Sequence, residues 1–356
     1  MTLSQIRQKI DMLDRKLLEL LNLRADLVHD IGRLKRREGL SAYSPEREEK
    51  LLRSLVKRSS HGRLPEKSVR AIYREIMSAS FALERGLIIA YLGPEATWTH
   101  QAARAKFGAS VEYSPQSSIT EVFSVVARGR ADYGVVPIEN STEGAVNHTL
   151  DVFMESDLKI CAQILLKIEN NLIAKVPRQK IRKVYSHPQV FGQCRQWLRQ
   201  NLPNVELVEV SSTTRAAQLA AKEKGAAALA GKMAAEVYKL KMLETSIQDS
   251  PDNTTRFLVI GPNFCPPTGD DKTSIMFSVR DRSGALLSAL EPFKRLKVNM
   301  NKIESRPSKR KVWEYFFFVD VDGHITDKKV MRAVAQLQKR CTLVKHLGSY
   351  PRSGVR

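Results

Sequence analysis

The sequence contains no apolar run that approaches the 18 or so residues of a membrane-spanning helix. Its first residues, Met1 to Ser4, lead directly into a charged helical pattern and lack the apolar segment and cleavage site of a signal peptide. Cysteine is scarce, and the chain contains no CxxC pair; its four cysteines are Cys161, Cys194, Cys265 and Cys341. These absences predict a cytoplasmic protein in a reducing compartment, without a membrane span or a metal site.

Nucleotide-binding motifs are also missing. No Gly-x-Gly-x-x-Gly follows a predicted strand, and the stretch 225–232 has one residue too many for a phosphate-binding loop. It is followed by Met233, where such a loop requires a hydroxyl. The sequence therefore predicts no nucleotide and no other cofactor.

Acidic residues are few compared with basic ones: 38 against 58, which gives a net charge of +20. The basic clusters, at 35–37 and 309–311, are short, far apart and without interleaved aromatics. We therefore favour a solvated basic surface first, small anionic ligands second and nucleic acid third. The length of 356 residues predicts two or three domains.

The first segment has a helical apolar period that continues for more than thirty residues from Ile6 to Leu34. A helix of this length requires a partner helix or a second chain. Arg24 and Lys35 fall inside its apolar stripe and Arg7 at the edge, so anionic partners are needed. Shorter helices are predicted after Ser44 and from Pro65 to about residue 85. A coiled-coil dimer with internally paired charges fits this pattern, and a DNA-binding module fits it less well.

After Gly86 the pattern changes to short strands that alternate with helices, which predicts an α/β domain in two lobes with a ligand cleft. The predicted strands are 87–91, 133–137, 159–168, 205–210 and 257–260, and the predicted helices include 119–128, 190–201 and 213–224. Residues 252–256, Asp-Asn-Thr-Thr-Arg, precede the last strand and are predicted to form a rigidly held loop rich in hydrogen-bonding groups.

A linker with Pro262, Pro266, Pro267 and Gly269 precedes the last segment. Its strands and helices are predicted in the order βαββαβ: a strand at 273–279, a helix from Gly284, a strand ending at Glu304, a strand at 313–321, a helix from Asp327 and a strand at 342–347. This order is typical of an α+β ferredoxin-like domain. Such a domain binds a ligand at an edge or pairs with a copy of itself.

Several motifs resemble those of known families. Asn253-Thr254-Thr255-Arg256-Phe257 resembles the Asn-x-Thr-Arg-Phe signature of prephenate dehydratases, and the hydroxyl- and amide-rich loops at 91–97, 137–144, 186–189 and 211–214 repeat that family's motifs in order. The helical segment resembles all-α chorismate mutases, which form intertwined dimers. Gly284-Ala285-Leu286 and Glu304-Ser305-Arg306-Pro307 resemble the ligand elements of ACT regulatory domains.

The resemblance implies a bifunctional chorismate mutase/prephenate dehydratase with a mutase domain at 1–86, a periplasmic-binding-protein-like dehydratase domain at 87–265 and an ACT domain at 270–352. Chorismate and prephenate are the implied substrates and L-phenylalanine the implied effector, in a homodimer or higher homo-oligomer that binds neither nucleic acid nor membrane. The implied mutase residues are Arg7, Arg24, Lys35, Ser44, Arg47, Glu48, Ser80 and Glu84, of which Lys35 and Glu84 are catalytic.

In the dehydratase domain the resemblance makes Thr255 the catalytic donor, with Asn140, Ser186, Gln189, Thr213 and Arg256 around the substrate. We interpret Arg256 as an anion anchor or a structural brace, and His187 as a general acid or a loop brace. The implied effector residues are Gly284, Ala285, Leu286, Glu304, Ser305 and Arg306.

The sequence departs from the family patterns at Ser44, where aspartate is expected, at Glu84, where some members have glutamine, and at Ala96, Trp98 and Asn170 near the dehydratase motifs. Because only a neutral Glu84 can donate to the substrate ether, we expect mutase activity to decline toward alkaline pH. Two alternatives stay open: a monofunctional dehydratase with a helical dimerisation domain, and a non-catalytic amino-acid sensor.

Overall fold

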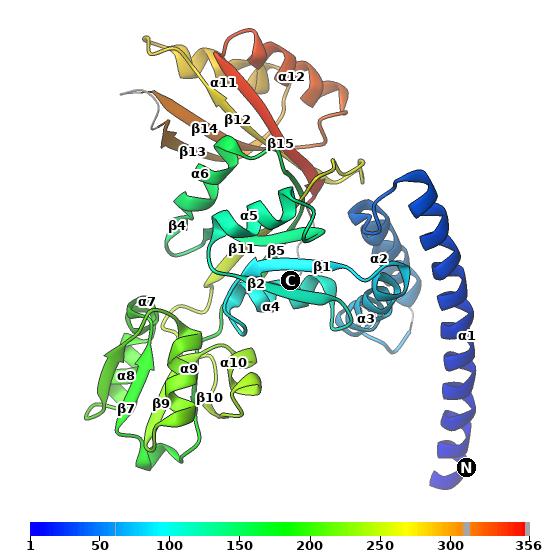
Figure 1. Ribbon diagram of the computed structural model, residues 1–356, viewed down its shortest axis with the longest axis vertical. Coiled ribbons are helices and arrows are strands. Elements are labelled where there is room, and N and C mark those ends of the chain that lie inside the picture. The colour runs from blue at the N-terminus through cyan, green and yellow to red at the C-terminus, as the bar shows by residue number, and fades with distance from the viewer. Residues whose placement is uncertain (61, 309–313, 353–356) are drawn as a thin grey trace. The chain divides into compact units, whose positions relative to one another are not determined.

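The computed structural model describes the chain apart from residues 61, 309–313 and 353–356. The chain divides into two compact units, one made of residues 1–88 and 107–112 and the other of residues 89–106 and 113–356. The helices of the first unit are α1 (Leu3–Glu38), α2 (Pro45–Ser59) and α3 (Glu66–Glu84) (Figure 1).

Helix α1 confirms the long helix that the apolar period predicts. It begins at a capping box, in which the Thr2 hydroxyl accepts from the Gln5 backbone while the Gln5 side chain accepts from the Thr2 backbone. It ends at Gly39, whose φ of 66° is the left-handed conformation that glycine adopts at low cost. Most of its apolar stripe is exposed in a single chain; Leu17 is 56% exposed.

Helices α1 and α3 pack closely at Gly32. A Cβ at this position would lie 3.1 Å from the Cα of Glu84, so a larger residue would push the helices apart. Val69, Met77, Ser80 and Glu84 of α3 are buried.

The second unit begins with a large lobe built on a sheet of strand order β2-β1-β3-β11-β5, with β4 beside β3. Strands β1 and β3 are parallel, whereas β11 runs antiparallel to both of its neighbours. The elements of this lobe are β1 (Ile88–Leu92), α4 (Trp98–Phe107), β2 (Glu112–Gln116), α5 (Ile119–Ala127), β3 (Tyr133–Asn140), β4 (Gly144–Ala145), α6 (Asn147–Glu155), β5 (Lys159–Lys167) and β11 (Thr254–Gly261).

A small lobe is inserted between β5 and β11, on a sheet of strand order β10-β6-β9-β7-β8. Its alanine-rich core packs α9 and α10 on one face of the sheet. Its elements are β6 (Asn171–Ala174), the 3-10 turn Arg178–Lys180, β7 (Lys183–Ser186), α7 (Pro188–Gln193), α8 (Arg195–Asn201), β8 (Glu206–Glu209), α9 (Thr213–Lys222), β9 (Ala226–Ala230), α10 (Lys232–Val237) and β10 (Lys241–Glu244).

Two predictions for these lobes are wrong. Residues Thr254 to Arg256 are not loop but the start of β11, because β3 and β5 on either side pair with their backbone. The helix predicted for 190–201 is broken at Cys194 into α7 and α8, since the backbone at Cys194 leaves the helical conformation (φ −116°, ψ 19°).

The C-terminal domain confirms the βαββαβ order. Its elements are β12 (Asp271–Ser278), α11 (Ala285–Arg295), β13 (Met300–Pro307), β14 (Tyr315–Asp322), α12 (Lys328–Gln338) and β15 (Leu343–Pro351), and the strand order is β13-β14-β12-β15. The predicted strand at 313–321 begins at Tyr315 among the described residues, and both residue 313 and the basic cluster at 309–311 lie outside them.

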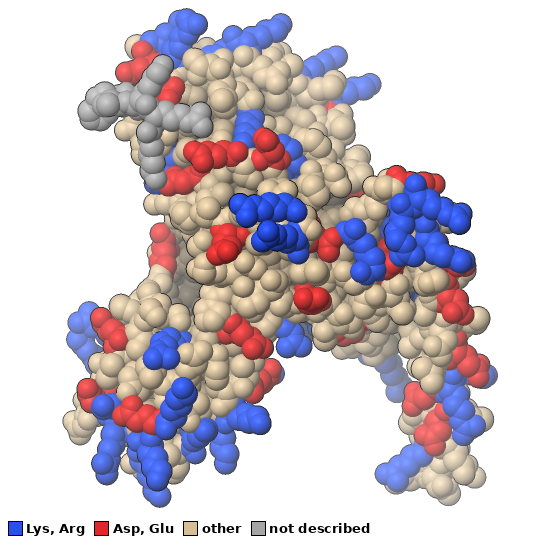
Figure 2. All heavy atoms as spheres, in the orientation of Figure 1, with Lys and Arg blue, Asp and Glu red and all other residues tan. Residues whose placement is uncertain are grey.

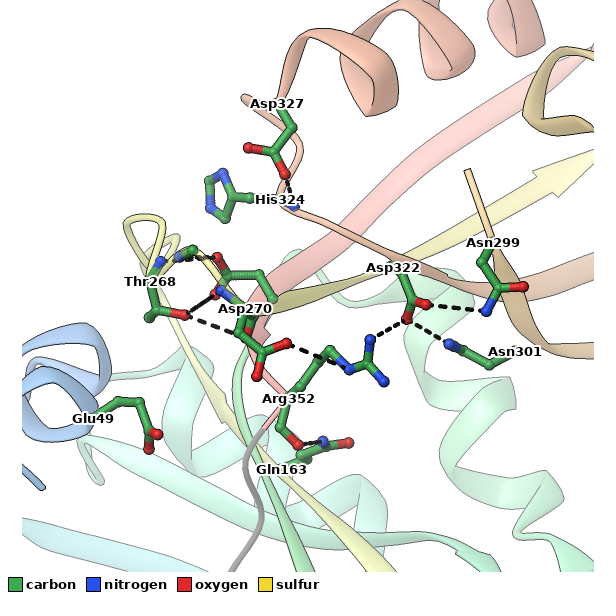
Figure 3. Close-up of polar contacts among 12 residues, drawn as sticks. Glu49, Gln163, Thr268, Asp270, Asn299, Asn301, Asp322, His324, Asp327 and Arg352 are labelled. Atoms are coloured by element: carbon green, nitrogen blue, oxygen red, sulfur yellow. Dashed lines mark hydrogen bonds and ion pairs between the residues drawn. The ribbon is translucent and has the colours of Figure 1, made fainter. Parts of the chain in front are cut away.

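The C-terminal domain docks on the large lobe through β15. At Gly348 a Cβ would lie 2.3 Å from the carbonyl oxygen of Ile160 in β5, so only glycine allows this approach. Figure 3 shows Arg352, just after β15, between Asp270 and Asp322, while its backbone oxygen accepts from Gln163 of β5.

Basic side chains are spread over the molecule. On the face that Figure 2 shows, Lys and Arg project from α1, from the small lobe and from the C-terminal domain, with Asp and Glu between them. This distribution agrees with a solvated basic surface. None of the described helices is long and apolar enough to cross a membrane.

Candidate functional sites

Two crossovers connect the lobes, one between β5 and β6 and the other between β10 and β11. They are bonded to each other: the Ile168 amide donates to the Asn253 carbonyl (2.8 Å), and the Ile247 amide donates to the Asn170 carbonyl (2.9 Å). The first residues of β11 lie directly after the second crossover, so they are at the boundary between the two lobes.

Thr255 lies in β11 opposite Asn140 of β3. The Asn140 Nδ2 donates to Thr255 Oγ1 (2.8 Å) and to Asn253 Oδ1 (2.9 Å), and its Oδ1 accepts from the Thr142 amide and hydroxyl. Thr255 is 9% exposed. Because its oxygen accepts from Asn140, its own proton is directed to another partner.

An amide chain continues from this pair toward the small lobe. Gln193 Oε1 accepts from the side-chain amides of Asn253 and Asn170, both at 3.1 Å, and Gln193 Nε2 donates to Glu143 (3.1 Å). Burial raises the pKa of Glu143, although His187 and the bond from Gln193 act in the opposite direction. Gln193 and Glu143 were missing from the predicted site, and Gln193 has no motif that would have indicated it.

The other predicted dehydratase residues lie in the small lobe. Ser186, fully buried at the end of β7, donates to the Leu229 carbonyl, and Thr213 begins α9. Gln189 is exposed in α7, and its backbone N–H donates to His187 Nδ1 at 3.4 Å. His187 therefore caps α7, which favours the brace over the general acid.

Arg256 points away from Thr255, because neighbouring strand residues face opposite sides of a sheet. Its guanidinium is buried and donates to Asp320 Oδ2 and to the Tyr350 hydroxyl, both at 2.7 Å. Burial alone lowers the pKa of Arg256, but Tyr350 and Asp320 more than reverse this and raise it above its usual value. The geometry favours the brace over the anion anchor.

In the helical unit, Lys35 of α1 lies at a pocket of about 200 Å³ lined by Gly32, Lys35, Arg36, Gly39, Leu40, Ala42, Glu84 and Arg85. The Lys35 Nζ donates to Glu84 Oε2 (3.1 Å) and to the Ala42 carbonyl (2.8 Å), and Arg36 donates to the Glu84 carbonyl. Arg24 donates to the Ser80 hydroxyl (2.5 Å). The cation-rich lining suits a dicarboxylate.

The remaining predicted mutase residues lie on α1 and α2. Ser44 is the N-cap of α2, where its side chain makes no capping hydrogen bond, and Glu48 is buried in that helix. Arg47 and Arg7 are exposed. Arg7 and Lys35 are 28 positions apart on one straight helix, which separates them by about 42 Å.

Comparison with known proteins gives three family matches in chain order: chorismate mutase type II at residues 6–85, prephenate dehydratase at 89–264 and the ACT domain at 273–338. A bifunctional chorismate mutase/prephenate dehydratase of Aquifex aeolicus is 48% identical, over 99% of this chain and 98% of the relative. Another, of Pseudomonas aeruginosa, is 44% identical over the same shares. The chain belongs to this bifunctional family.

Membership confirms the predicted chorismate mutase and prephenate dehydratase, and it favours this reading over the monofunctional enzyme and the sensor. The structure of a prephenate dehydratase from Arthrobacter aurescens in complex with L-Phe is similar, with a TM-score of 0.70 and 34% identity over 75% of this chain and 90% of that chain. The three predicted fold classes are confirmed as well.

The predicted effector residues lie on two elements of the ACT domain. Gly284, with φ +73°, is the N-cap of α11, and Ala285 and Leu286 begin that helix. Glu304, Ser305 and Arg306 lie on the edge strand β13. Arg306 forms a two-point contact with Asp151 of α6 (3.0 and 3.1 Å), so its guanidinium already holds a carboxylate of the large lobe.

Proposed function

We propose that the helical domain rearranges chorismate to prephenate and that the two-lobed domain converts prephenate to phenylpyruvate, carbon dioxide and water. The observation that carries this proposal is Thr255, held by Asn140 at the lobe crossovers within the segment that matches prephenate dehydratase. Both reactions need positioning and hydrogen-bond donors but no redox step.

In the dehydratase step, the electrons of the broken carbon–carboxylate bond complete the aromatic ring as the ring hydroxyl leaves with its electron pair. A hydroxide is a poor leaving group, so a donor aimed at this oxygen lowers the barrier. Thr255 is that donor in our proposal. Asn140 fixes the threonine oxygen and leaves its proton for the substrate.

In the mutase step, the rearrangement is pericyclic, so the protein holds the compact conformer and stabilises charge on the breaking ether. Lys35 is the proposed donor to that ether, and Arg24 and Arg47 are proposed to bind carboxylates. Glu84 lies beside this donor, with its Oε2 3.1 Å from the Lys35 Nζ. The decline of mutase activity toward alkaline pH that we expect from Glu84 stays a prediction.

We infer a homodimer formed through α1. Several leucines of this helix are more than half exposed in a single chain, including Leu13, Leu17 and Leu20, and a second chain would bury them. In addition, Arg7 is too far from Lys35 for both to contact the same pocket within one chain. Light scattering after size-exclusion chromatography tests this. Native protein is expected as a dimer or larger, and Leu17→Glu as smaller, with Lys16→Glu as the matched control. A native monomer would contradict the proposal.

L-Phenylalanine is the proposed inhibitor, bound by the ACT domain at the elements around Gly284 and Glu304. The test of the whole scheme is to supply chorismate to the purified protein and to follow prephenate and phenylpyruvate with and without phenylalanine. Prephenate that accumulates without phenylpyruvate would contradict the dehydratase assignment. A phenylpyruvate rate that phenylalanine leaves unchanged would contradict the effector assignment.

A further inference from the structure

Strands β3 and β11 carry two residue pairs that face opposite sides of the same sheet. Thr255 pairs in register with Asn140, and the next pair is Arg256 with Glu139. The first pair forms the hydrogen bond at the crossovers, whereas the second contacts the ACT domain. A shift in Arg256 or Glu139 therefore acts on the backbone that also positions Thr255 and Asn140.

Arg256 closes a buried ring of hydrogen bonds with the ACT residues Asp320, Tyr350 and Ser274. It donates to Asp320 and to the Tyr350 hydroxyl, and the Ser274 hydroxyl donates to Asp320 Oδ1 (2.5 Å). Since the Ser274 proton is used in this way, the Tyr350 hydroxyl donates to Ser274 Oγ (2.7 Å). All four residues are less than 10% exposed, so a rearrangement that separated Arg256 from Asp320 would break a buried ion pair of 2.7 Å and leave Arg256 only its longer contact of 3.6 Å to Glu139.

The strand that carries Glu304 to Arg306 is attached to the same ring. Lys302 of β13 lies opposite Asp320 of β14 in the sheet register, and its Nζ is 2.9 Å from Glu139. Along β13 the less exposed residues alternate with exposed ones and include Lys302, Glu304 and Arg306. Lys302 forms an ion pair with Glu139 of the large lobe, and Arg306 forms one with Asp151 of the large lobe. A ligand at Glu304 thus meets a strand that is fixed to the catalytic lobe on both sides of it.

We propose that the ring of Arg256, Asp320, Tyr350 and Ser274 is the element through which the ACT domain controls the position of Thr255. The inference rests on the proposed function and names the route of its regulation. Arg256 acts here as a positioning residue. A shift of β13 and β14 moves Asp320, and Arg256 must follow because separating the buried ion pair is costly.

The experiment compares dehydratase turnover with and without saturating phenylalanine in full-length native enzyme, Asp320→Asn and Tyr350→Phe. Calorimetry measures phenylalanine binding in parallel. The inhibition ratio does not depend on the active fraction of a preparation, so a purely structural loss leaves it unchanged. Measured at prephenate concentrations well below KM, the native ratio is expected to be about 5- to 150-fold, the size of an ordinary coupling between two binding sites. Asp320→Asn is expected to reduce it to about 1 while phenylalanine still binds, and Tyr350→Phe to an intermediate value.

Asp322→Asn is the matched control, because it is the same substitution two residues further along β14. Its partners, Arg352, Asn299 and Asn301, lie outside the ring (Figure 3). It is expected to keep the native ratio. Should Asp320→Asn fail to fold, Arg256→Gln combined with Asp320→Asn leaves no unpaired charge and is expected to give the same ratio near 1.

Two results would overturn the inference: a native inhibition ratio in folded Asp320→Asn or in the double variant, or an equal loss in Asp322→Asn. Failure of the proposed function is seen separately, in the native enzyme. It would make no phenylpyruvate, or its phenylpyruvate rate would not respond to phenylalanine, before any variant is compared.

Discussion

Asn140 Nδ2 lies 2.8 Å from Thr255 Oγ1 and donates to it. The two residues lie on neighbouring strands and are 115 positions apart in the sequence. The direction of this bond matters, because a hydroxyl that accepts from an amide keeps its own proton for another partner. In the proposed mechanism that partner is the departing ring hydroxyl of prephenate. The predictions for the dehydratase follow from this geometry.

Thr255→Ala is expected to lower dehydratase kcat by about 10² to 10³, the usual cost of losing one preorganised donor. Prephenate formation from chorismate should continue, because the mutase residues lie in the other unit. Separate assays with chorismate and with prephenate measure this. The matched control is Thr254→Ala at the neighbouring residue, which faces the other side of the strand. A Thr255→Ala enzyme with near-native dehydratase kcat would remove Thr255 from the mechanism.

Asn140→Asp is expected to be more harmful than Asn140→Ala. An ionised aspartate has no proton to donate, so it would accept the Thr255 proton that the substrate needs, whereas alanine only removes the anchor. Both variants should lower dehydratase kcat, the aspartate variant by about 10² or more. Steady-state kinetics with prephenate distinguish them. An aspartate variant as active as the alanine variant would show that the direction of the bond is unimportant.

Lys35→Met is expected to reduce mutase kcat/KM by at least about 10²-fold, through loss of the proposed donor to the ether oxygen. Dehydratase turnover of supplied prephenate should be unchanged. Arg33→Met serves as the control, because Arg33 is an exposed cation on the same helix and pairs with Asp30. If both variants lose the same activity, the effect reflects surface charge and the role of Lys35 is wrong.

Acid should destabilise the dehydratase lobe through His100. Burial and the nearby Arg104 lower the pKa of His100 to about 4, and its Nδ1 accepts from the Ala96 amide (3.1 Å), which requires the neutral ring. An unfolded histidine titrates near pH 6.5, so the unfolded state binds more protons between pH 6.5 and 4. The free energy of unfolding therefore falls as pH decreases through this window, by up to about 3 kcal/mol.

Denaturant titrations of native protein and His100→Phe at several pH values test this dependence. The variant keeps an aromatic ring against Tyr91, which stacks on His100 at 4.5 Å, and should show a weaker pH dependence. Burial and Lys159 also lower the pKa of His346 to about 4, so part of the dependence should persist. His148→Gln, at an exposed position, is the control. An unchanged pH dependence in His100→Phe would exclude His100 as a contributor.

The sequence alone determined the long helix, the change to an α/β pattern after residue 86 and the βαββαβ order at the end of the chain. These features depend on the spacing of apolar residues, which reports on burial over a few neighbouring turns or strands. The resemblance of its short motifs to those of prephenate dehydratases also indicated Thr255 and Asn140 as members of one site.

Only the tertiary structure decided what Arg256 contacts. Residues 252–256 are polar, and the sequence therefore predicted a loop. Strands β3 and β5 satisfy the backbone of Thr254 to Arg256 on both sides and make these residues strand. Once they form a strand, alternation sends Thr255 toward the crossovers and Arg256 to Asp320, 64 residues away in the sequence. A partner this distant is set by which strands pair and by how two domains pack, and local periodicity carries no information about either.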